Sequence, residues 1–292
     1  MLVTMKELLE HARMNKYGVA AANVFNDRTV RASFQVADSL KAPLIIACTP
    51  FVELEELAYM AAFYEKKYPK ARIALNLDHG QSYDHAMRAI RCGFTSVMID
   101  KSTLPYEENV REVKEVVKAA HSVGVTVEAE LGHVGKGAEY EQTRDSGLTR
   151  REEAVSFVEE TGVDCLAVAV GTSHGVYKGT PNLNFELLAD LRNLLQIPLV
   201  LHGGSNTGDE NLKKTIDLGI QKINLSTDLS TGFFEGVYRF ARETGEIVNA
   251  EGTVTYEGNR TVLANQALEA GTRGWETMLR HYVTVFDSAG KA

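Results

Sequence analysis

Three of the eight histidines stand in equivalent places in the sequence. His79, His174 and His202 each lie at or just after the end of a short apolar run, and each is followed directly by a glycine. The glycine lets the backbone turn sharply and lets a ligand approach closely. One histidine at such a place is more often structural, but three in the same phase favour a shared role. Three neutral imidazoles with an open fourth position are the donor set of a catalytic zinc site.

Carboxylates follow the same apolar runs. Asp78 adjoins His79, Asp100 ends the next run, and Glu130 ends the one after that. A carboxylate beside a metal ligand is able to coordinate the metal, orient the histidine, or act as acid or base. Adjacent strand residues point to opposite faces, so Asp78 and His79 both reach one pocket only if the strand ends between them.

Two segments rich in glycine and hydroxyl groups follow the last two apolar runs. The first is Gly203-Gly204-Ser205, and the second is the SerThrAsp triplet at residues 226–228. Barrels often bind phosphate at this place through backbone N–H groups, hydroxyls and a helix N-terminus. The pair of segments therefore indicates a phosphate site, and Lys178 offers an additional positive charge.

The elements that position these residues alternate regularly along the chain. Continuous apolar runs, typical of strands covered on both faces, predict eight strands at residues 17–24, 44–47, 73–77, 96–99, 126–131, 165–170, 199–201 and 222–225. Helical spacing predicts helices at 27–39 (with Asp27 as the cap), 107–122, 151–161, 184–195, 209–218 and 263–286, and the chain is expected to continue as helix after residue 225. Residues 249–260 are expected to form a polar loop.

Eight such units predict a (β/α)8 TIM barrel over residues 1–292, as a single domain with an extra C-terminal helix. An open doubly wound sheet is the alternative. The sequence argues against this alternative because the first strand, which ends Ala22-Asn23-Val24, is not followed by a GxGxxG fingerprint. In a barrel the carboxyl ends of all strands converge, so the polar residues named above are expected to meet there.

Composition excludes several classes of protein. The net charge of −8 argues against a nucleic-acid or membrane partner. The three cysteines form no CxxC pair, which indicates a reducing compartment. The first residues lack the pattern of a secretory signal, and no apolar run approaches the ~20 residues of a membrane span. We therefore expect a cytoplasmic protein.

Five segments, in order and with matching spacing, resemble the class II fructose/tagatose-bisphosphate aldolases. The likeness extends from about residue 5 to residue 234, and the closing DSAGK at 287–291 is also similar to the family. The five segments are Asp78-His79-Gly80, VEAELG at 127–132, AVGTSHGVY at 169–177, PLVLHGGS at 198–205 and KINLST at 222–227.

The resemblance implies a zinc-dependent lyase that cleaves a phosphorylated ketose to dihydroxyacetone phosphate and an aldehyde. Zinc would be held by His79, His174 and His202, and would polarise the ketose C2 oxygen. Asp78 matches the acid/base that takes the C4 hydroxyl proton. Asn224 matches the residue that hydrogen-bonds the enediolate.

The resemblance also implies the remaining site residues. Asp100, Ser102 and Glu130 match second-sphere or alternate metal positions, and Asn23 and Thr49 match positions that face the far end of the sugar. A monovalent cation, Na+ or K+, usually accompanies the C1 phosphate in the family. The positions that match the phosphate site are Gly175, Gly203, Ser205, Ser226 and Thr227.

Two departures from the family pattern leave alternatives open. The loop after the fifth strand places Glu139 about one position away from the usual proton carrier, so that role stays open between Glu139 and Glu141. Fructose-type members tend to have Asp where this chain has Ser226, which slightly favours a tagatose-bisphosphate or related substrate. Whether the aldehyde carries a phosphate stays open.

Two other functions remain as alternatives at this point. One is a zinc hydrolase that uses the same three histidines to activate water. The other is a noncatalytic accessory subunit on the same barrel, against which the retention of Asp78 beside the histidines argues. The resemblance further implies a homodimer or homotetramer.

Overall fold

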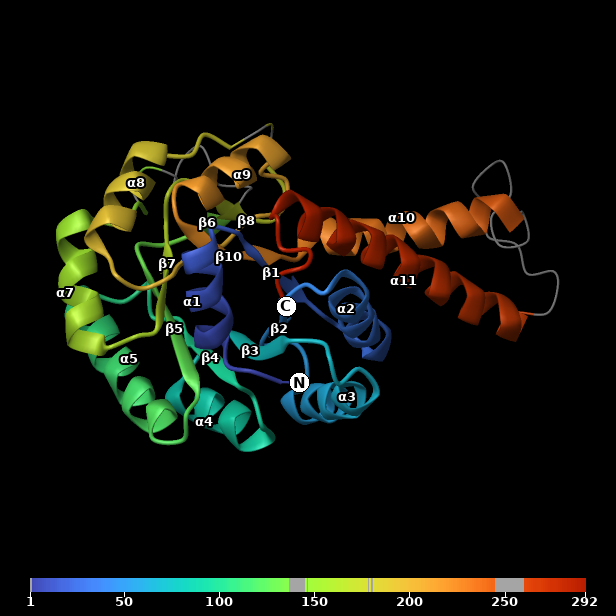
Figure 1. The fold of residues 1–292 in the computed structure, drawn as a ribbon, viewed down its shortest axis with the longest axis horizontal. Helices are drawn as coiled ribbons and strands as arrows, with labels where there is room; N and C mark the ends of the chain where they lie inside the picture. Colours follow the sequence, from blue (N-terminus) through green and yellow to red (C-terminus); the bar gives the residue numbers. More distant parts are fainter. Residues whose placement is uncertain (1, 137–144, 146, 178, 180, 245–259) are drawn as a thin grey trace.

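The computed structural model describes residues 2–136, 145, 147–177, 179, 181–244 and 260–292. Its centre is a closed barrel of eight parallel strands (Figure 1), in which each strand pairs with its neighbours along the chain and the last pairs with the first. All eight expected strands are present. They are β1 (Val19–Asn23), β2 (Leu44–Cys48), β3 (Ile73–Gly80), β4 (Ser96–Ile99), β5 (Thr126–Leu131), β7 (Cys165–Val168), β9 (Leu199–Leu201) and β10 (Ile220–Leu225).

Helices surround the barrel and follow its strands in turn. The expected helices are confirmed as α2 (Asp27–Leu40), α5 (Tyr106–His121), α7 (Arg151–Thr161), α8 (Phe185–Leu194), α9 (Asp209–Asp217) and α11 (Arg260–Val285). The helix expected directly after residue 225 is confirmed as α10 (Thr227–Thr244). The structure adds α1 (Met5–Asn15), α3 (Leu54–Lys67) and α4 (Tyr83–Cys92). A two-stranded sheet of β6 (Gly135–Lys136) and β8 (Ser173–His174) lies outside the barrel.

The cap of α2 differs from the expectation. Asn26, not Asp27, is the N-cap, because Asn26 has extended backbone angles and its side chain accepts a hydrogen bond from the Thr29 N–H. Asp27 is the first helical residue, where its negative charge still favours the helix dipole.

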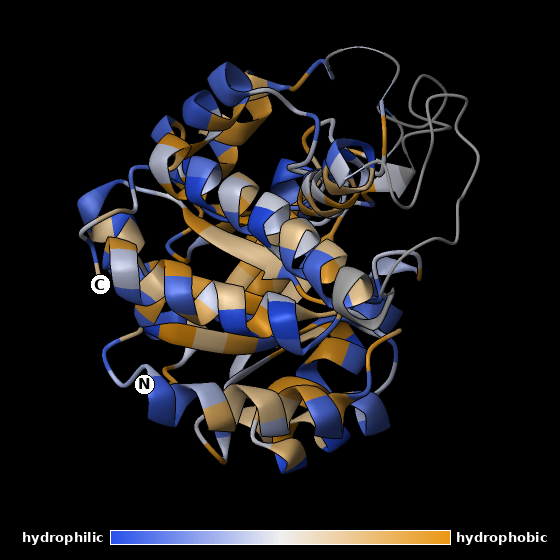
Figure 2. Ribbon diagram, turned by 90° about the vertical axis from the view of Figure 1, so that its right-hand side faces the viewer, coloured by the Kyte–Doolittle hydropathy of each residue, from blue (hydrophilic) through white to orange (hydrophobic). Residues whose placement is uncertain are grey.

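Apolar side chains fill two regions and leave one end of the barrel polar. The larger cluster lies between the strands and the helices, and Figure 2 shows largely apolar strands behind helices of mixed hydropathy. The smaller cluster joins α1 to the interior of the barrel near the amino-terminal ends of the strands, where Leu8 and Leu9 pack with Val19, Ile45 and Val200. Helix α1 thus covers the amino-terminal end of the barrel.

Helices α10 and α11 form an arm that projects from the barrel (Figure 1). They pack against each other at glycines, and a Cβ added to Gly274 would lie 2.0 Å from the Gly232 carbonyl oxygen. Arg28 and Arg31 of α2 bind Glu269 and so fasten α11 to α2. None of the helices in the described ranges is long and apolar enough to cross a membrane.

Candidate active site

A cavity of about 120 Å3 opens at the carboxyl ends of the barrel strands. Every side chain and glycine that lines it belongs to the site expected from the sequence. The lining consists of Asn23, Thr49, Asp78, His79, His174, Gly175, Gly203, Ser205, Asn224, Ser226 and Thr227. The barrel thus brings together residues that lie up to 204 positions apart (Asn23 and Thr227, 227 − 23 = 204).

A bend in β3 brings both Asp78 and His79 to this cavity. The strand continues to Gly80, but its pairing with β4 shifts register between Leu77 and Gly80. His79 has a φ of 52°, a left-handed conformation that costs a non-glycine residue about 1–3 kcal/mol. A Cβ at position 80 would lie 2.2 Å from the Met98 carbonyl oxygen, so only glycine fits there. The expectation that the strand ends between the two residues is therefore replaced by a local bend.

The three imidazoles face one another. Their ring centroids are 4.7 Å apart for His79 and His202, 5.0 Å for His79 and His174, and 5.8 Å for His174 and His202. His79 Nδ1 is 2.7 Å from Asp100 Oδ2, and His202 Nε2 is 2.9 Å from Glu128 Oε1. Because a carboxylate only accepts hydrogen bonds, each of these nitrogens donates, and the remaining nitrogens carry lone pairs.

Those two remaining nitrogens, His79 Nε2 and His202 Nδ1, lie 3.0 Å apart. Two lone pairs at this distance repel each other unless a proton or a metal ion lies between them. One donor atom from each of the three histidines lies within 4.8 Å of the others. Ligand nitrogens of a tetrahedral zinc site are separated by about 3.3 Å, given Zn–N bonds of about 2.0–2.1 Å. The residues present fit a zinc ion.

The charges around the imidazoles also favour a cation. Burial lowers the pKa of His79, but Asp78 and the bond to Asp100 outweigh it and raise the pKa to about 9, so without a metal this ring holds a second proton at pH 7, which zinc would replace. Burial, together with the other two imidazoles, lowers the pKa of His174 to about 3, so His174 is neutral at pH 7 and able to donate a lone pair.

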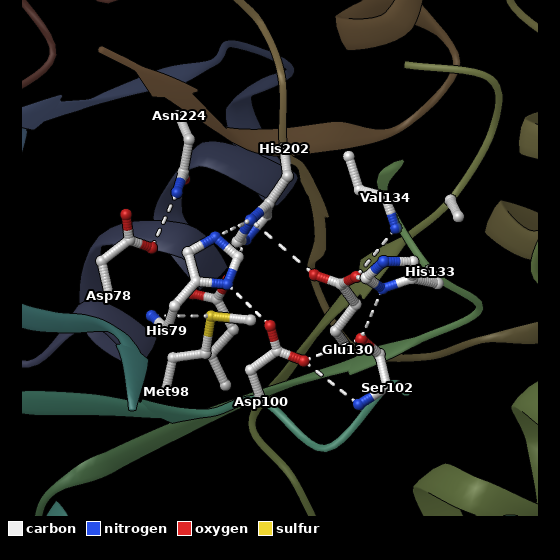
Figure 3. Close-up of polar contacts among 12 residues, drawn as sticks. Asp78, His79, Met98, Asp100, Ser102, Glu130, His133, Val134, His202 and Asn224 are labelled. Carbon is white, nitrogen blue, oxygen red and sulfur yellow. Dashed lines mark hydrogen bonds and ion pairs between the residues drawn. The ribbon is translucent and has the colours of Figure 1, made fainter. Parts of the chain in front are cut away.

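Asp78 is buried and held from two sides. Its Oδ2 accepts a hydrogen bond from Asn23 Nδ2 and its Oδ1 accepts one from Asn224 Nδ2, each at 2.9 Å (Figure 3 shows the bond to Asn224). Burial raises its pKa, but His79, Lys222 and His202 lower it well below the usual range, so Asp78 is ionised. Within the described ranges, neither cluster of potential metal ligands includes Asp78. An ionised carboxylate at this place is able to accept a proton beside the candidate metal site.

A second cluster of potential ligands consists of His79, Asp100 and Glu130. Asp100 also accepts hydrogen bonds from the backbone N–H of Ser102 at 3.1 Å and from its hydroxyl at 2.8 Å (Figure 3). Glu130 Oε1 accepts the Val134 N–H at 3.0 Å, whereas its buried Oε2 lies 3.8 Å from His202 Nδ1 and has no hydrogen-bond partner among the residues that the structure describes. Burial raises the pKa of Glu130. An unpartnered carboxylate oxygen at this place is a further sign of a cation site.

The opposite side of the cavity suits an anion. Helix α10 begins at Thr227, and Ser205 Oγ accepts the N–H groups of Ser226 and Asp228, both at 3.2 Å. Ser205 therefore caps this helix and still has its own hydroxyl hydrogen to donate. Gly203 has a φ of 68° and lies so close to Ser173 that a Cβ would meet its carbonyl oxygen at 2.4 Å. The arrangement is a helix N-terminus lined by hydroxyls, as phosphate sites often are.

Three of the expected site residues are not described by the structure, and one further histidine lies away from the cavity. Glu139, Glu141 and Lys178 fall outside the described residues. His133, which the sequence places after the fifth strand, is half exposed and contacts Ser102 without lining the cavity.

Two buried charged residues were not identified as site residues from the sequence. Glu128 lies between His202 and Lys222, and its Oε2 is 2.6 Å from Lys222 Nζ. Both side chains are completely buried inside the barrel. The available signal was strand alternation, because Glu128 shares a face with Glu130 and Lys222 shares a face with Asn224.

Comparison with known proteins agrees with this geometry. The family described as fructose-bisphosphate aldolase class-II matches residues 3–291. The chain belongs to the class II fructose-bisphosphate aldolase family. The match covers nearly the whole chain, from the residues before α1 to those after α11.

Solved structures extend the comparison. The YdjI aldolase from Escherichia coli K12 is 30% identical, with a TM-score of 0.83 over 100% of both chains. A candidate fructose-1,6-bisphosphate aldolase from Coccidioides immitis is 26% identical, with a TM-score of 0.77 over 98% of this chain and 97% of that one. The fructose-bisphosphate aldolase from Campylobacter jejuni is 21% identical and, with a TM-score of 0.77 over 100% and 97%, shares the fold. The class II aldolase family supports a lyase activity for this barrel.

Proposed function

We propose that this class II aldolase is a zinc-dependent lyase that reversibly cleaves a phosphorylated ketose to dihydroxyacetone phosphate and an aldehyde. The observation that carries the proposal is the position of Asp78. It is an ionised, buried carboxylate held by two amides, directly beside three convergent imidazoles. When bound to His79, His174 and His202, zinc would supply a Lewis acid for the C2 oxygen of the ketose.

The chain's own residues account for the proton and the charge. In cleavage, Asp78 takes the proton of the C4 hydroxyl, the C3–C4 bond breaks, and its electron pair stays on the dihydroxyacetone phosphate half. Asn224 holds Asp78 with one hydrogen of its Nδ2 and lines the cavity, and its second Nδ2 hydrogen is proposed to bond the enediolate oxygen. A loop glutamate, Glu139 or Glu141, then returns a proton to C3. In condensation, the same groups act in reverse.

The phosphate of the ketose is proposed to bind at the N-terminus of α10. Support comes from the capped helix end, from Ser205, and from the lining glycines Gly175 and Gly203. A small hydroxyl residue, Ser226, at the place where fructose-type members tend to have Asp favours a tagatose-type or related ketose phosphate over fructose bisphosphate. Asn23 and Thr49 line the cavity and are proposed to contact the far end of the sugar.

We further propose that the protein forms a homodimer or homotetramer through the arm of α10 and α11. On this arm, Phe234 has an exposed fraction of 69% and Tyr238 one of 59%, which is unusual for large aromatic side chains. A cavity of about 690 Å3 on the arm is lined by both acidic and basic groups, including Glu235 and Arg239. A second copy related by a twofold axis would place these opposite charges against each other.

The proposed activity is tested by incubating the protein with a panel of ketose mono- and bisphosphates, with and without a chelator. Released dihydroxyacetone phosphate is coupled to its enzymatic reduction. Release that depends on metal supports the lyase, and the fastest substrate identifies the preferred ketose. Release of inorganic phosphate without dihydroxyacetone phosphate would instead indicate the zinc hydrolase.

A further inference from the structure

A buried ion pair lies inside the barrel directly behind one of the proposed zinc ligands. Glu128 of β5 and Lys222 of β10 are both fully buried, and the distance between Glu128 Oε2 and Lys222 Nζ is 2.6 Å. The other carboxylate oxygen, Oε1, lies 2.9 Å from His202 Nε2. One carboxylate therefore joins a lysine to an imidazole, and none of these three side chains contacts solvent.

This contact determines which nitrogen of His202 carries the hydrogen. A carboxylate has no hydrogen to donate, so Nε2 must donate to Glu128, and the lone pair of the ring must then be on Nδ1. Nδ1 is the atom that faces His79 Nε2 at 3.0 Å. The orientation of His202 toward the metal position thus follows from the position of Glu128.

Lys222 holds Glu128 in that position. A carboxylate buried without a partner is costly, and the ammonium group supplies both the opposite charge and a short hydrogen bond. Lys222 also requires an acceptor, so it prevents the carboxylate from rotating away from the line between Nζ and His202.

We propose that Glu128, fixed by Lys222, is a positioning residue that sets the tautomer and ring orientation of His202 for metal binding. The proposal rests on the zinc site of the proposed function. In this respect Glu128 acts on His202 as Asp100 acts on His79, from the far side of the ring.

The alternative explanation is that the ion pair of Glu128 and Lys222 only stabilises the barrel. The chain offers a control for that effect at the other end of the barrel. Asp164 is also buried, and it accepts a hydrogen bond from His121 Nε2 at 2.8 Å and one from Lys6 Nζ at 3.1 Å. It has the same carboxylate, imidazole and ammonium chemistry but contacts no proposed zinc ligand.

The first test variant is Glu128→Gln. Lys222 still requires an acceptor, so the glutamine oxygen faces Lys222 and its NH2 group faces His202 Nε2. The hydrogen of His202 then moves to Nδ1, away from the orientation that binds metal. We expect zinc binding weakened by about 10–100-fold, which is typical for loss of a second-sphere partner.

The second variant, Glu128→Met with Lys222→Met, removes both charges together. Replacement of a buried ion pair by apolar side chains of similar size is often neutral for stability. This double variant therefore folds even where Glu128→Gln does not, while His202 has lost its acceptor. We expect its zinc affinity to fall by the same ~10–100-fold. Activity is not the readout, because Lys222 also acts on the charge of Asp78.

Zinc dissociation constants are measured by competition with a chelating dye, and the protonated nitrogen of each histidine is assigned by 15N NMR of the zinc-free protein. Weaker zinc binding in both Glu128 variants, a changed His202 tautomer in Glu128→Gln, and unchanged zinc binding in Asp164→Asn support the proposal. Wild-type affinity in the double variant, or an unaltered tautomer in Glu128→Gln, overturns it. If the wild-type protein itself binds no zinc, the proposed function fails instead.

Discussion

Replacement of Asp78 by alanine separates metal binding from chemistry. The Asp78 carboxylate accepts hydrogen bonds from Asn23 and Asn224 at 2.9 Å and belongs to neither cluster of metal donors in the described ranges. We therefore expect Asp78→Ala to keep its zinc. Loss of a positioned general base lowers a rate by about 10²–10⁴-fold, which corresponds to ~3–5 kcal/mol of activation free energy.

Alanine is the cleaner substitution at this position. An asparagine at position 78 would place its own NH2 group against the NH2 group of Asn23 or Asn224, because both neighbours donate to the carboxylate. Such a donor–donor contact costs about 1–3 kcal/mol and would disturb the cavity. Loss of activity in Asp78→Asn would then have two causes.

The assay compares two reactions of the same variant. Cleavage of the ketose phosphate needs the C4 hydroxyl proton to be removed, which is the role assigned to Asp78. Exchange of the hydroxymethyl hydrogen of dihydroxyacetone phosphate with deuterated water needs only the metal and the loop glutamate. Asp78→Ala should lose cleavage by about 10²–10⁴-fold and lose much less of the exchange, followed by NMR.

Two results would refute this reasoning. Loss of zinc from purified Asp78→Ala would make Asp78 part of the metal site. Cleavage reduced by less than about tenfold, with zinc retained, would remove Asp78 from the proton transfer.

Three further predictions concern other parts of the molecule. Ser205→Ala should raise the KM for the ketose phosphate by about 10–100-fold, because a hydrogen bond to a charged group is lost, and an unchanged KM would place the phosphate elsewhere. The double variant Phe234→Asp with Tyr238→Asp should convert the proposed oligomer to monomers, as measured by light scattering. An unchanged mass would exclude this face of the arm as the interface between subunits. At the contact between α2 and α11, the hydrogen bond from Arg31 holds the pKa of Glu269 below its ordinary value. In urea denaturation, wild type should therefore be more stable than Glu269→Gln at pH 7 and down to the unfolded carboxyl pKa of about 4.3. This difference in stability should disappear as the pH falls through the lower pKa of the folded protein. A difference that does not change with pH would contradict the prediction.

The sequence predicted the barrel and the convergence of the imidazoles because both follow from repetition. Each repeat ends its strand at the same place, so His79, His174 and His202 share a phase before any contact is known. All eight strands were placed correctly because continuous apolar runs mark strands that are covered on both faces.

The bend at His79 was beyond prediction from sequence. Its left-handed φ depends on the register shift between β3 and β4 and on the contact of Gly80 with the Met98 carbonyl, both of which are properties of the closed barrel. Local propensity opposes such a φ at histidine, so only tertiary packing accounts for it.

The contacts of Glu128 with His202 and Lys222 could not be predicted from the sequence, for a related reason. Both Glu128 and Lys222 stand in segments that resemble the family, but 94 residues separate them, and only barrel closure brings their side chains to 2.6 Å. The arm of α10 and α11 was likewise unpredicted as a pair. Helical spacing identifies the terminal helix, but the close packing of Gly232 on Gly274 emerges only when the two helices meet.

The central claim is that His79, His174 and His202 together hold a zinc ion. Anomalous diffraction at the zinc edge, from crystals of the zinc-loaded protein, tests it most directly. We expect one strong peak about 2.0–2.1 Å from His79 Nε2, from His202 Nδ1 and from a ring nitrogen of His174. A peak held only by Asp100 and Glu130, or the absence of any peak in this cavity, would contradict it.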